Sequence, residues 1–237
     1  MPKMTQIKII AMKEFKDYFI SPIAYIVISL FLIVSGWFFF STFFIFGRAD
    51  LRDFFSLLPL IFSFIIPALT MRLFSEEKNV GSYETLLTMP VSFSDIALGK
   101  FLAATLFTAA MLVPTLSYPL FISFVGELDP GPVIGGYLGA VLLAAAYCSM
   151  GLFASALTRN QIIAFIIGSA LCFTLTILDR MLFFMPEKLV AIIEFIGANS
   201  HFMNISRGII DSRDILYFIS LIFVFIFSTY IVMHEKN

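Results

Sequence analysis

The segment of the chain with the most chemical potential runs from residue 76 to residue 100, EEKNVGSYETLLTMPVSFSDIALGK, between two long apolar runs. It begins with adjacent carboxylates at Glu76 and Glu77, which could act as an acid–base pair. It ends with Gly99-Lys100, which could belong to a phosphate-binding loop. Three interpretations compete: a phosphate-binding loop, a solvated linker, or a surface that a soluble partner grips.

The phosphate-binding loop fails on its spacing. Such a loop needs a glycine five residues before the Gly-Lys pair and a Ser or Thr directly after it, so that backbone amides cradle the phosphates and a hydroxyl binds Mg²⁺. Those two positions are Ser94 and Phe101 here. We therefore expect no nucleotide site in this chain.

Other catalytic combinations are missing from the sequence as well. Neighbouring residues on a helix point about 100° apart, so Glu76 and Glu77 would form a poor acid–base pair. The histidines, His201 and His234, are expected on opposite sides of a membrane, and the sequence has no HExxH or CxxC motif. We therefore expect a chain that is not an enzyme and holds no metal or cofactor.

The composition indicates a protein whose solvent is lipid. Hydrophobic residues make up 60% of the chain, charged residues only 13%, and the mean hydropathy is +0.99, whereas soluble domains carry about 25% charged residues. A net charge of −1 without a clustered basic face argues against nucleic-acid binding. Six apolar runs approach the roughly 20 residues that a membrane-crossing helix needs: 22–46, 54–74, 101–125, 133–157, 162–184 and 215–233.

These runs predict an all-α polytopic membrane protein with residues 1–237 in a single domain. The runs are continuous rather than alternating, and a backbone in lipid must satisfy its hydrogen bonds within its own segment, so helices are favoured over strands. An even number of spans places both termini on one side. That side holds nine of the 15 basic residues, which predicts that the termini and segment 76–100 are cytoplasmic.

Two further segments are expected to lie at the membrane surfaces. Residues 5–20 have the pattern of an amphipathic helix in the interface, although they could also be a simple lysine-rich anchor. Residues 185–213 contain an apolar stretch that is too short to cross, which predicts a re-entrant or interfacial segment on the outer side.

The polar segment itself has helix stop and start signals. Gly81 can end one short helix, and Ser82 can cap a second one, SYETLLTM, with Glu84 in its first turn. Pro90 would end that second helix.

A small apolar patch on the second helix, made by Leu86, Leu87 and Met89, is typical of a partner site on a water-facing element. Alternatively, these side chains pack onto the membrane ends of neighbouring helices, and the charges at residues 76–78 form a solvated face.

Small residues recur at four-residue spacing in the fourth run, at Gly131, Gly135 and Gly139. This spacing lets membrane helices approach closely. The approach could occur inside the subunit or across a dimer, and we favour the inside of the subunit.

Several short motifs in a fixed order resemble the segment after the second span of ABC-2-type transporter permeases. They are Met71-Arg72, Glu76-Glu77, Gly81-Ser82, Glu84-Thr85-Leu86-Leu87, Pro90-Val91 and Leu98-Gly99-Lys100. The stretches KEFKDYFISPIAYIV and HFMNISRGIIDSRDILYF extend the likeness over most of the chain. The second stretch is most similar to the permeases associated with gliding motility.

The resemblance implies a six-span permease of ABC-2 exporter type in the cytoplasmic membrane of a bacterium. It implies a second permease subunit, identical or homologous, and a separate ATPase that carries ATP and Mg²⁺. Segment 76–100 would then be the part that the ATPase grips, through Glu76, Glu77, Gly81, Ser82, Glu84, Leu86, Leu87 and Pro90.

The expected function is ATP-driven export or extraction of an unidentified substrate. The alternative is a membrane scaffold of an envelope or gliding-motility complex that moves no solute. A protein with a large extracytoplasmic domain is a further expected partner, besides membrane lipid.

Overall fold

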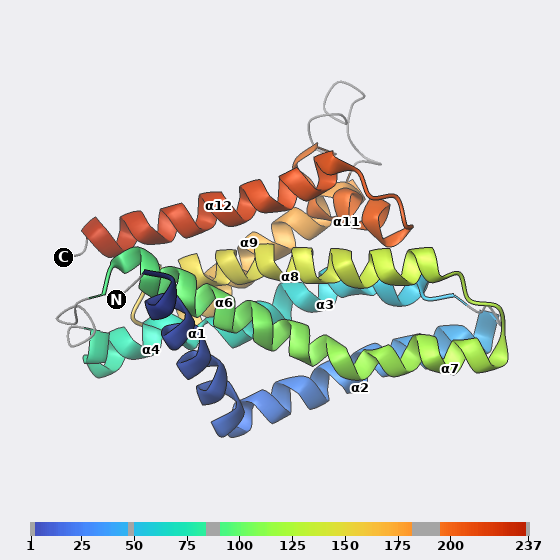
Figure 1. The fold of residues 1–237 in the computed structure, drawn as a ribbon, viewed down its shortest axis with the longest axis horizontal. Coiled ribbons are helices and arrows are strands. Elements are labelled where there is room, and N and C mark those ends of the chain that lie inside the picture. The colour runs from blue at the N-terminus through green and yellow to red at the C-terminus, as the bar shows by residue number, and fades with distance from the viewer. Residues whose placement is uncertain (1–2, 47–49, 84–90, 182–194, 236–237) are drawn as a thin grey trace.

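The computed structural model describes residues 3–46, 50–83, 91–181 and 195–235 of the chain. Within these ranges all regular secondary structure is helical, and most of the long helices run roughly along one axis (Figure 1). The helices are α1 (Lys3–Ile20), α2 (Pro22–Phe46), α3 (Arg52–Thr70), α4 (Arg72–Val80), α6 (Phe93–Leu112), η1 (Val113–Leu116), α7 (Ser117–Val125), α8 (Pro130–Leu157), α9 (Gln161–Met181), α11 (Ala198–Ser206) and α12 (Ser212–Glu235).

Six helical stretches are long and apolar enough to cross a membrane, as predicted. They are Pro22–Ile45, Arg52–Val80, Phe93–Val125, Pro130–Leu157, Gln161–Asp179 and Ser212–His234. Each overlaps one of the six apolar runs, so the all-α polytopic architecture is confirmed.

The third stretch begins earlier than the predicted residue 101, because a side chain caps the helix at residue 92. The Ser92 hydroxyl accepts a hydrogen bond from the Asp95 amide at 3.2 Å, which satisfies one of the free amides at a helix start. Residues 93–100 therefore form the first turns of α6 and are not part of a loop.

Helix α8 is the central element and packs against α3, α6, α9, α11 and α12. Two of its glycines face α11 within the same chain. A Cβ at Gly135 would lie 2.3 Å from the Ile205 carbonyl oxygen, and one at Gly139 would lie 3.2 Å from Ile205 Cγ2. A Cβ at Gly131 would make an ordinary contact, 3.4 Å from Asp129 Oδ1. Gly135 and Gly139 thus serve packing inside the subunit.

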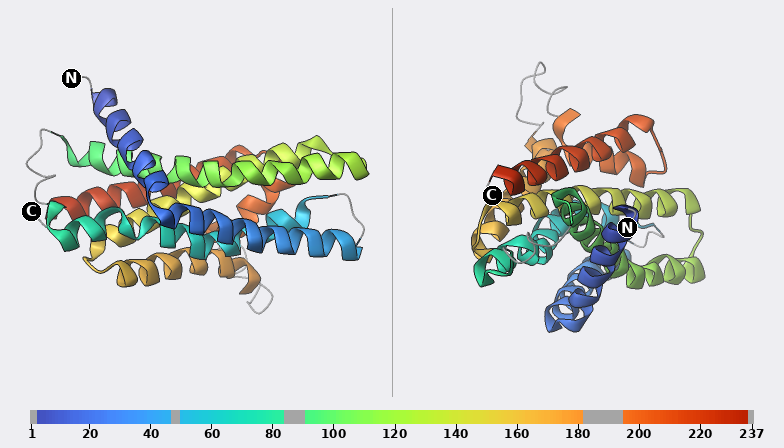
Figure 2. Two further views of the ribbon diagram at one scale, coloured as in Figure 1. Left: turned by 90° about the horizontal axis from the view of Figure 1, so that it is seen from below. Right: turned by 60° about the vertical axis from the view of Figure 1, so that its left-hand side comes forward.

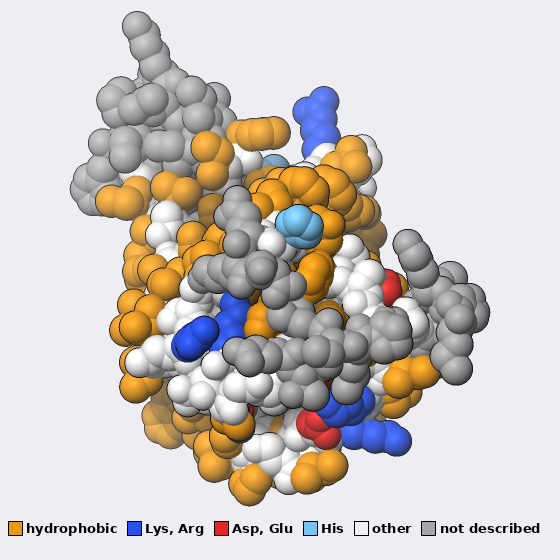
Figure 3. Space-filling view, turned by 90° about the vertical axis from the view of Figure 1, so that its left-hand side faces the viewer, with side chains coloured by type: hydrophobic (Ala, Val, Ile, Leu, Met, Phe, Trp, Pro, Cys, Tyr) orange, Lys and Arg blue, Asp and Glu red, His pale blue; other side chains and the backbone are white. Residues whose placement is uncertain are grey.

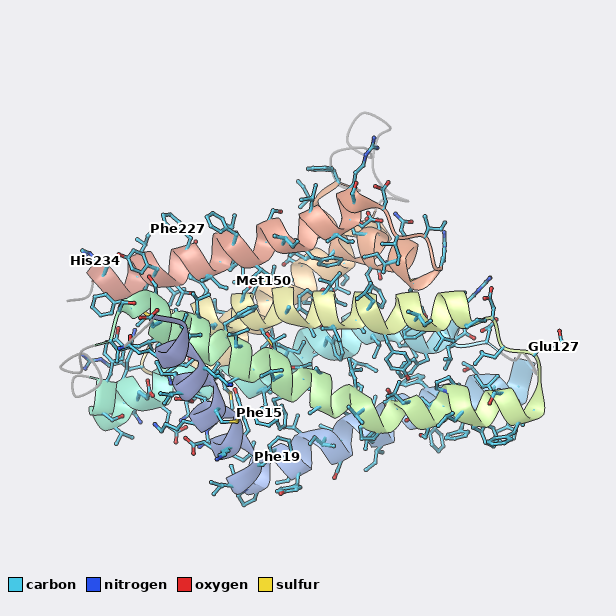
Figure 4. The ribbon with its side chains drawn as sticks, in the orientation of Figure 1. Phe15, Phe19, Glu127, Met150, Phe227 and His234 are labelled. Atoms are coloured by element: carbon cyan, nitrogen blue, oxygen red, sulfur yellow. The ribbon has the colours of Figure 1, made fainter. Side chains whose placement is uncertain are left out.

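Helix α1 crosses the bundle at a steep angle and lies against α6 (Figure 2). Ile10 presses against Gly99, where a Cβ would lie 2.6 Å from Ile10 Cγ2. Two aromatic residues of α1 continue this contact, since the rings of Phe19 and Tyr18 lie 5.3 and 4.9 Å from the ring of Phe107 in α6. One face of the predicted amphipathic helix, which includes Phe15 and Phe19 (Figure 4), is therefore covered by protein.

The outer segment that was predicted at residues 185–213 is described only from residue 195 onward. Helix α11 lies against α8 and α9, with Phe202 and Ile205 fully buried. The His201 ring stacks on Tyr217 at 4.0 Å, and its Nδ1 lies 2.6 Å from Asp214 Oδ1 of α12. The re-entrant course itself stays a prediction.

Candidate functional site

The candidate site lies at the end of the bundle where α4 ends and α6 begins. Figure 3 shows this end, where Lys, Arg, Asp and Glu side chains are exposed among hydrophobic ones. The loop with Glu127 lies at the opposite end from His234 (Figure 4). Residues 76–83 and 91–100 are described; the predicted site residues Glu84, Leu86, Leu87 and Pro90 lie outside the described residues.

Lys100 is the centre of the site. Its side chain is only 1% exposed, and its Nζ lies 3.0 Å from Glu14 Oε1 and 2.7 Å from Glu77 Oε1. A buried ammonium is costly unless it is paired and hydrogen-bonded, and two carboxylates meet that requirement here. The cluster ties together α1, α4 and α6, which supply one charged residue each.

The close approach of α1 depends on the residue before the lysine. Any Cβ at position 99 would clash with Ile10 of α1. Because Gly99 has no Cβ, α1 lies close enough to α6 for its Glu14 to reach Lys100. Lys100 Nζ also lies 5.4 Å from the centre of the Phe74 ring. The structure thus explains two residues of the Leu-Gly-Lys motif: Gly99 allows the close approach of α1, and Lys100 forms the ion cluster.

The other charges at residues 76–78 also have partners within the chain. Arg72 binds Glu76 through two hydrogen bonds of 2.6 and 2.9 Å, one helical turn apart. Lys78 Nζ donates to the carbonyl oxygen of Ala156, in the last turn of α8. Glu77 and Lys78 are therefore bound within the chain, whereas the Glu76 side chain stays 40% exposed.

Gly81 is the C-cap that ends α4. Gly81 has φ 81°, a left-handed conformation that glycine adopts without steric cost. The Ser82 hydroxyl donates to the Glu77 carbonyl at 3.4 Å. Burial, together with the nearby Glu77 carboxylate, raises the pKa of the Tyr83 hydroxyl above its usual value. Ser82 and Tyr83, the first residues of the predicted second helix, are helical, and the remaining residues of that helix lie outside the described part of the chain.

A cavity of about 220 Å³ opens beside this cluster, between α1, the start of α2, the α3–α4 junction and α6. Its charged lining carries both signs, with Lys13, Glu14, Asp17, Arg72, Glu76, Glu77 and Lys100. Among the described residues no group of three or more His, Cys, Asp or Glu side chains is placed to hold a metal ion.

The sequence did not assign a role to Glu14 or Lys100. Lys100 was counted as one of the cytoplasmic positive charges, yet its neighbours along α6, Ala97, Ala103 and Ala104, are fully buried. Small apolar residues at these helical spacings around a lysine are a signal that its side chain is buried. Its partner Glu14 is 86 residues away, and nothing in the sequence pairs them.

The family model of the ABC-2 type transporter matches residues 5–186, which is more than half of the chain. The chain belongs to the ABC-2 type transporter family. It is therefore a multi-pass membrane permease subunit of an ABC transporter, a type of subunit that works with an ABC ATPase and a second permease subunit. The matched range includes the whole of segment 76–100 and the Lys100 cluster. A comparison with curated proteins gives no match.

Proposed function

We propose that segment 76–100 transmits the movement of a separate ATPase to the membrane helices of this permease. The observation that carries the proposal is the ion pair between Glu77 and Lys100, which joins the two ends of the segment. Because Glu14 of α1 binds the same ammonium, a force on residues 84–90 would act on α1, α4 and α6 together.

The residues of the segment divide into two groups in this proposal. Glu76, Glu77, Gly81 and Ser82 form the base, which is fixed to the rest of the chain through Arg72, Lys100 and the end of α4. Glu84, Leu86, Leu87 and Pro90 form the part that enters the ATPase. ATP and Mg²⁺ would be bound on that ATPase.

The proposal places this end of the bundle and both termini in the cytoplasm of a bacterium. The lysine-rich N-terminal segment supports the orientation, because basic residues are enriched on the cytoplasmic side. We further propose that the direction of transport is outward, by export or extraction. The likeness of residues 201–218 to gliding-motility-associated permeases supports a substrate or partner with a large extracytoplasmic domain.

The test is the ATP turnover of the partner ATPase reconstituted with this permease. We expect Glu84→Arg, which reverses a charge, and Leu86→Pro, which breaks a helix, to abolish the permease-dependent change in turnover without reducing membrane insertion. Glu127→Arg is the matched control, because it makes the same charge reversal at the opposite end of the bundle.

Wild-type turnover and ATPase binding in both variants would contradict the assigned role of the segment. If no ATPase binds the wild-type permease, the scaffold interpretation replaces the transport interpretation.

A further inference from the structure

The second membrane stretch is interrupted at Met71, between α3 and α4. Met71 keeps right-handed helical angles, with φ −54° and ψ −28°, so the interruption concerns the hydrogen bonds of the helix and not the conformation of this residue. The first amides of α4 nevertheless need acceptors, because a helix start leaves four amides without partners inside the helix.

A side chain from a distant helix supplies the acceptor. Ser155 of α8 accepts hydrogen bonds from the amides of Phe74 and Ser75, both at 3.0 Å, and donates to the Met71 carbonyl at 2.8 Å. A hydroxyl has one donor and two acceptor positions, so all three are used. Insertion of a side chain into the ladder of helical hydrogen bonds is a known cause of helix interruption.

The surroundings of Ser155 hold the junction close to α8. One turn earlier, a Cβ at Gly151 would lie 1.9 Å from Thr70 Oγ1, so only a glycine allows this approach of α3. One residue later, the carbonyl of Ala156 accepts from Lys78 Nζ of α4. Gly151, Ser155 and Ala156 near the end of α8 therefore contact, in that order, the last turn of α3, the interruption at Met71, and α4.

We propose that Ser155 is a positioning residue that sets the direction of α4, the helix that precedes residues 84–90 in the chain. Without its hydroxyl, two buried amides and the Met71 carbonyl lose a partner, and the ladder can close into one continuous helix. The direction of α4 relative to α8 would then change. The consequence for transport rests on the proposed function of segment 76–100, but the structural role of Ser155 does not.

Ser149 offers a matched control on the same helix. It is also fully buried, but its hydroxyl donates to the Ala146 carbonyl of α8 itself, at 2.7 Å. Ser149→Ala therefore removes a buried serine hydroxyl of α8 without touching the junction.

The experiment measures the distance between α4 and the end of α8 in the purified permease, with spin labels at Asn79→Cys and Arg159→Cys. Both positions are exposed, and the native Cys148 and Cys172 are buried. We expect Ser155→Ala to shift the distance or to widen its distribution about twofold, and Ser149→Ala to leave it unchanged. Ser155→Thr, which keeps a hydroxyl, should resemble the wild type.

Hydrogen exchange gives a second, independent readout. The amides of Phe74 and Ser75 should exchange at least about tenfold faster in Ser155→Ala than in Ser149→Ala. If Ser155→Ala does not fold, Ser155→Cys replaces it, since a thiol has nearly the same size but bonds weakly, and faster exchange is again expected. Unchanged distances and exchange would overturn the inference.

A final measurement, of ATP turnover, distinguishes the role of Ser155 from the proposed function of segment 76–100. With the ATPase present, Ser155→Ala should reduce permease-dependent ATP turnover at least about fivefold relative to Ser149→Ala. Altered distances with unchanged turnover would overturn Ser155 as a positioning residue for coupling. Failure of the wild-type permease to bind an ATPase would contradict the proposed function alone, because the distance measurement needs no ATPase.

Discussion

The Nζ of Lys100 lies 2.7 Å from Oε1 of Glu77, so an ion pair closes the two ends of the polar segment that separates the second and third membrane stretches. The same ammonium binds Glu14 of α1. Segment 76–100 is thus closed at its base by an ion pair of its own and held there by α1, and this arrangement suits an element that transmits force.

Replacement of Lys100 tests the cluster energetically. We expect Lys100→Met to destabilise the protein by roughly 3 kcal/mol, because the two partly buried carboxylates lose their common counter-ion. Thermal unfolding in detergent measures the effect. Lys16→Met, at an exposed position of α1, is the control and should change stability by less than about 0.5 kcal/mol.

The double variant Lys100→Met/Glu77→Gln should regain part of that loss, because one of the two uncompensated charges is removed. Equal stability of Lys100→Met and Lys16→Met would show that the buried ion cluster does not stabilise the fold.

The glycine row on α8 gives a second prediction, which compares two members of one motif. Gly135→Ala should cost about 1–3 kcal/mol, because its Cβ would clash with the Ile205 carbonyl oxygen. Gly131→Ala should be neutral or stabilising, because alanine favours a helix and meets only an ordinary contact there. Thermal unfolding of the monomeric protein measures both.

If the row served a dimer interface instead, Gly135→Ala would leave the monomer's unfolding temperature unchanged and weaken subunit association. Cross-linking between subunits distinguishes the two results.

Cysteine labelling tests the orientation in the membrane. Asn79 of α4 and Glu127 are exposed, and α4 lies at the opposite end of the bundle from the loop with Glu127 (Figures 1 and 4); each is replaced by cysteine in turn. We expect an impermeant maleimide to label residue 127 in intact cells and residue 79 only after permeabilisation. The background should be low, because Cys148 and Cys172 are buried. The reverse pattern would place segment 76–100 on the outer side and exclude its contact with a cytoplasmic ATPase.

The contact between His201 and Asp214 joins α11 to α12 at 2.6 Å. We expect His201→Gln and Asp214→Asn to destabilise the protein non-additively, with a coupling energy of about 0.5–3 kcal/mol. A double-mutant cycle by thermal unfolding measures it. Additive effects would mean that α11 is held by its apolar contacts, which include Phe202 and Ile205.

Local sequence patterns predicted the elements of this fold but not how their side chains meet. The six spans followed from apolar run length, and the end of α4 followed from Gly81. Ser92 was missed as a cap, so the start of α6 was placed too late. The length of an apolar run and the residues of a turn can be read from consecutive positions of the sequence. The exact start or end of a helix, in contrast, depends on single hydrogen bonds.

The long-range contacts of the site could not be read from the sequence. Lys100 meets Glu14 over 86 residues, and Ser155 meets Ser75 over 80 residues. Polar residues near span ends have many possible partners, and only the three-dimensional path of α1 and α8 selects among them. A buried lysine among alanines indicates that a counter-ion exists, but not which residue supplies it.

The most direct test of the central claim is cross-linking from residue 84 in native membranes. A photoreactive amino acid replaces Glu84, and another replaces Glu127 as the control at the opposite end; the products are identified by mass spectrometry. We predict a stoichiometric product with a soluble ABC ATPase from residue 84 and none from residue 127. If the ATPase is absent from the products of residue 84, or is captured equally from residue 127, segment 76–100 is not the element that couples the ATPase to this permease.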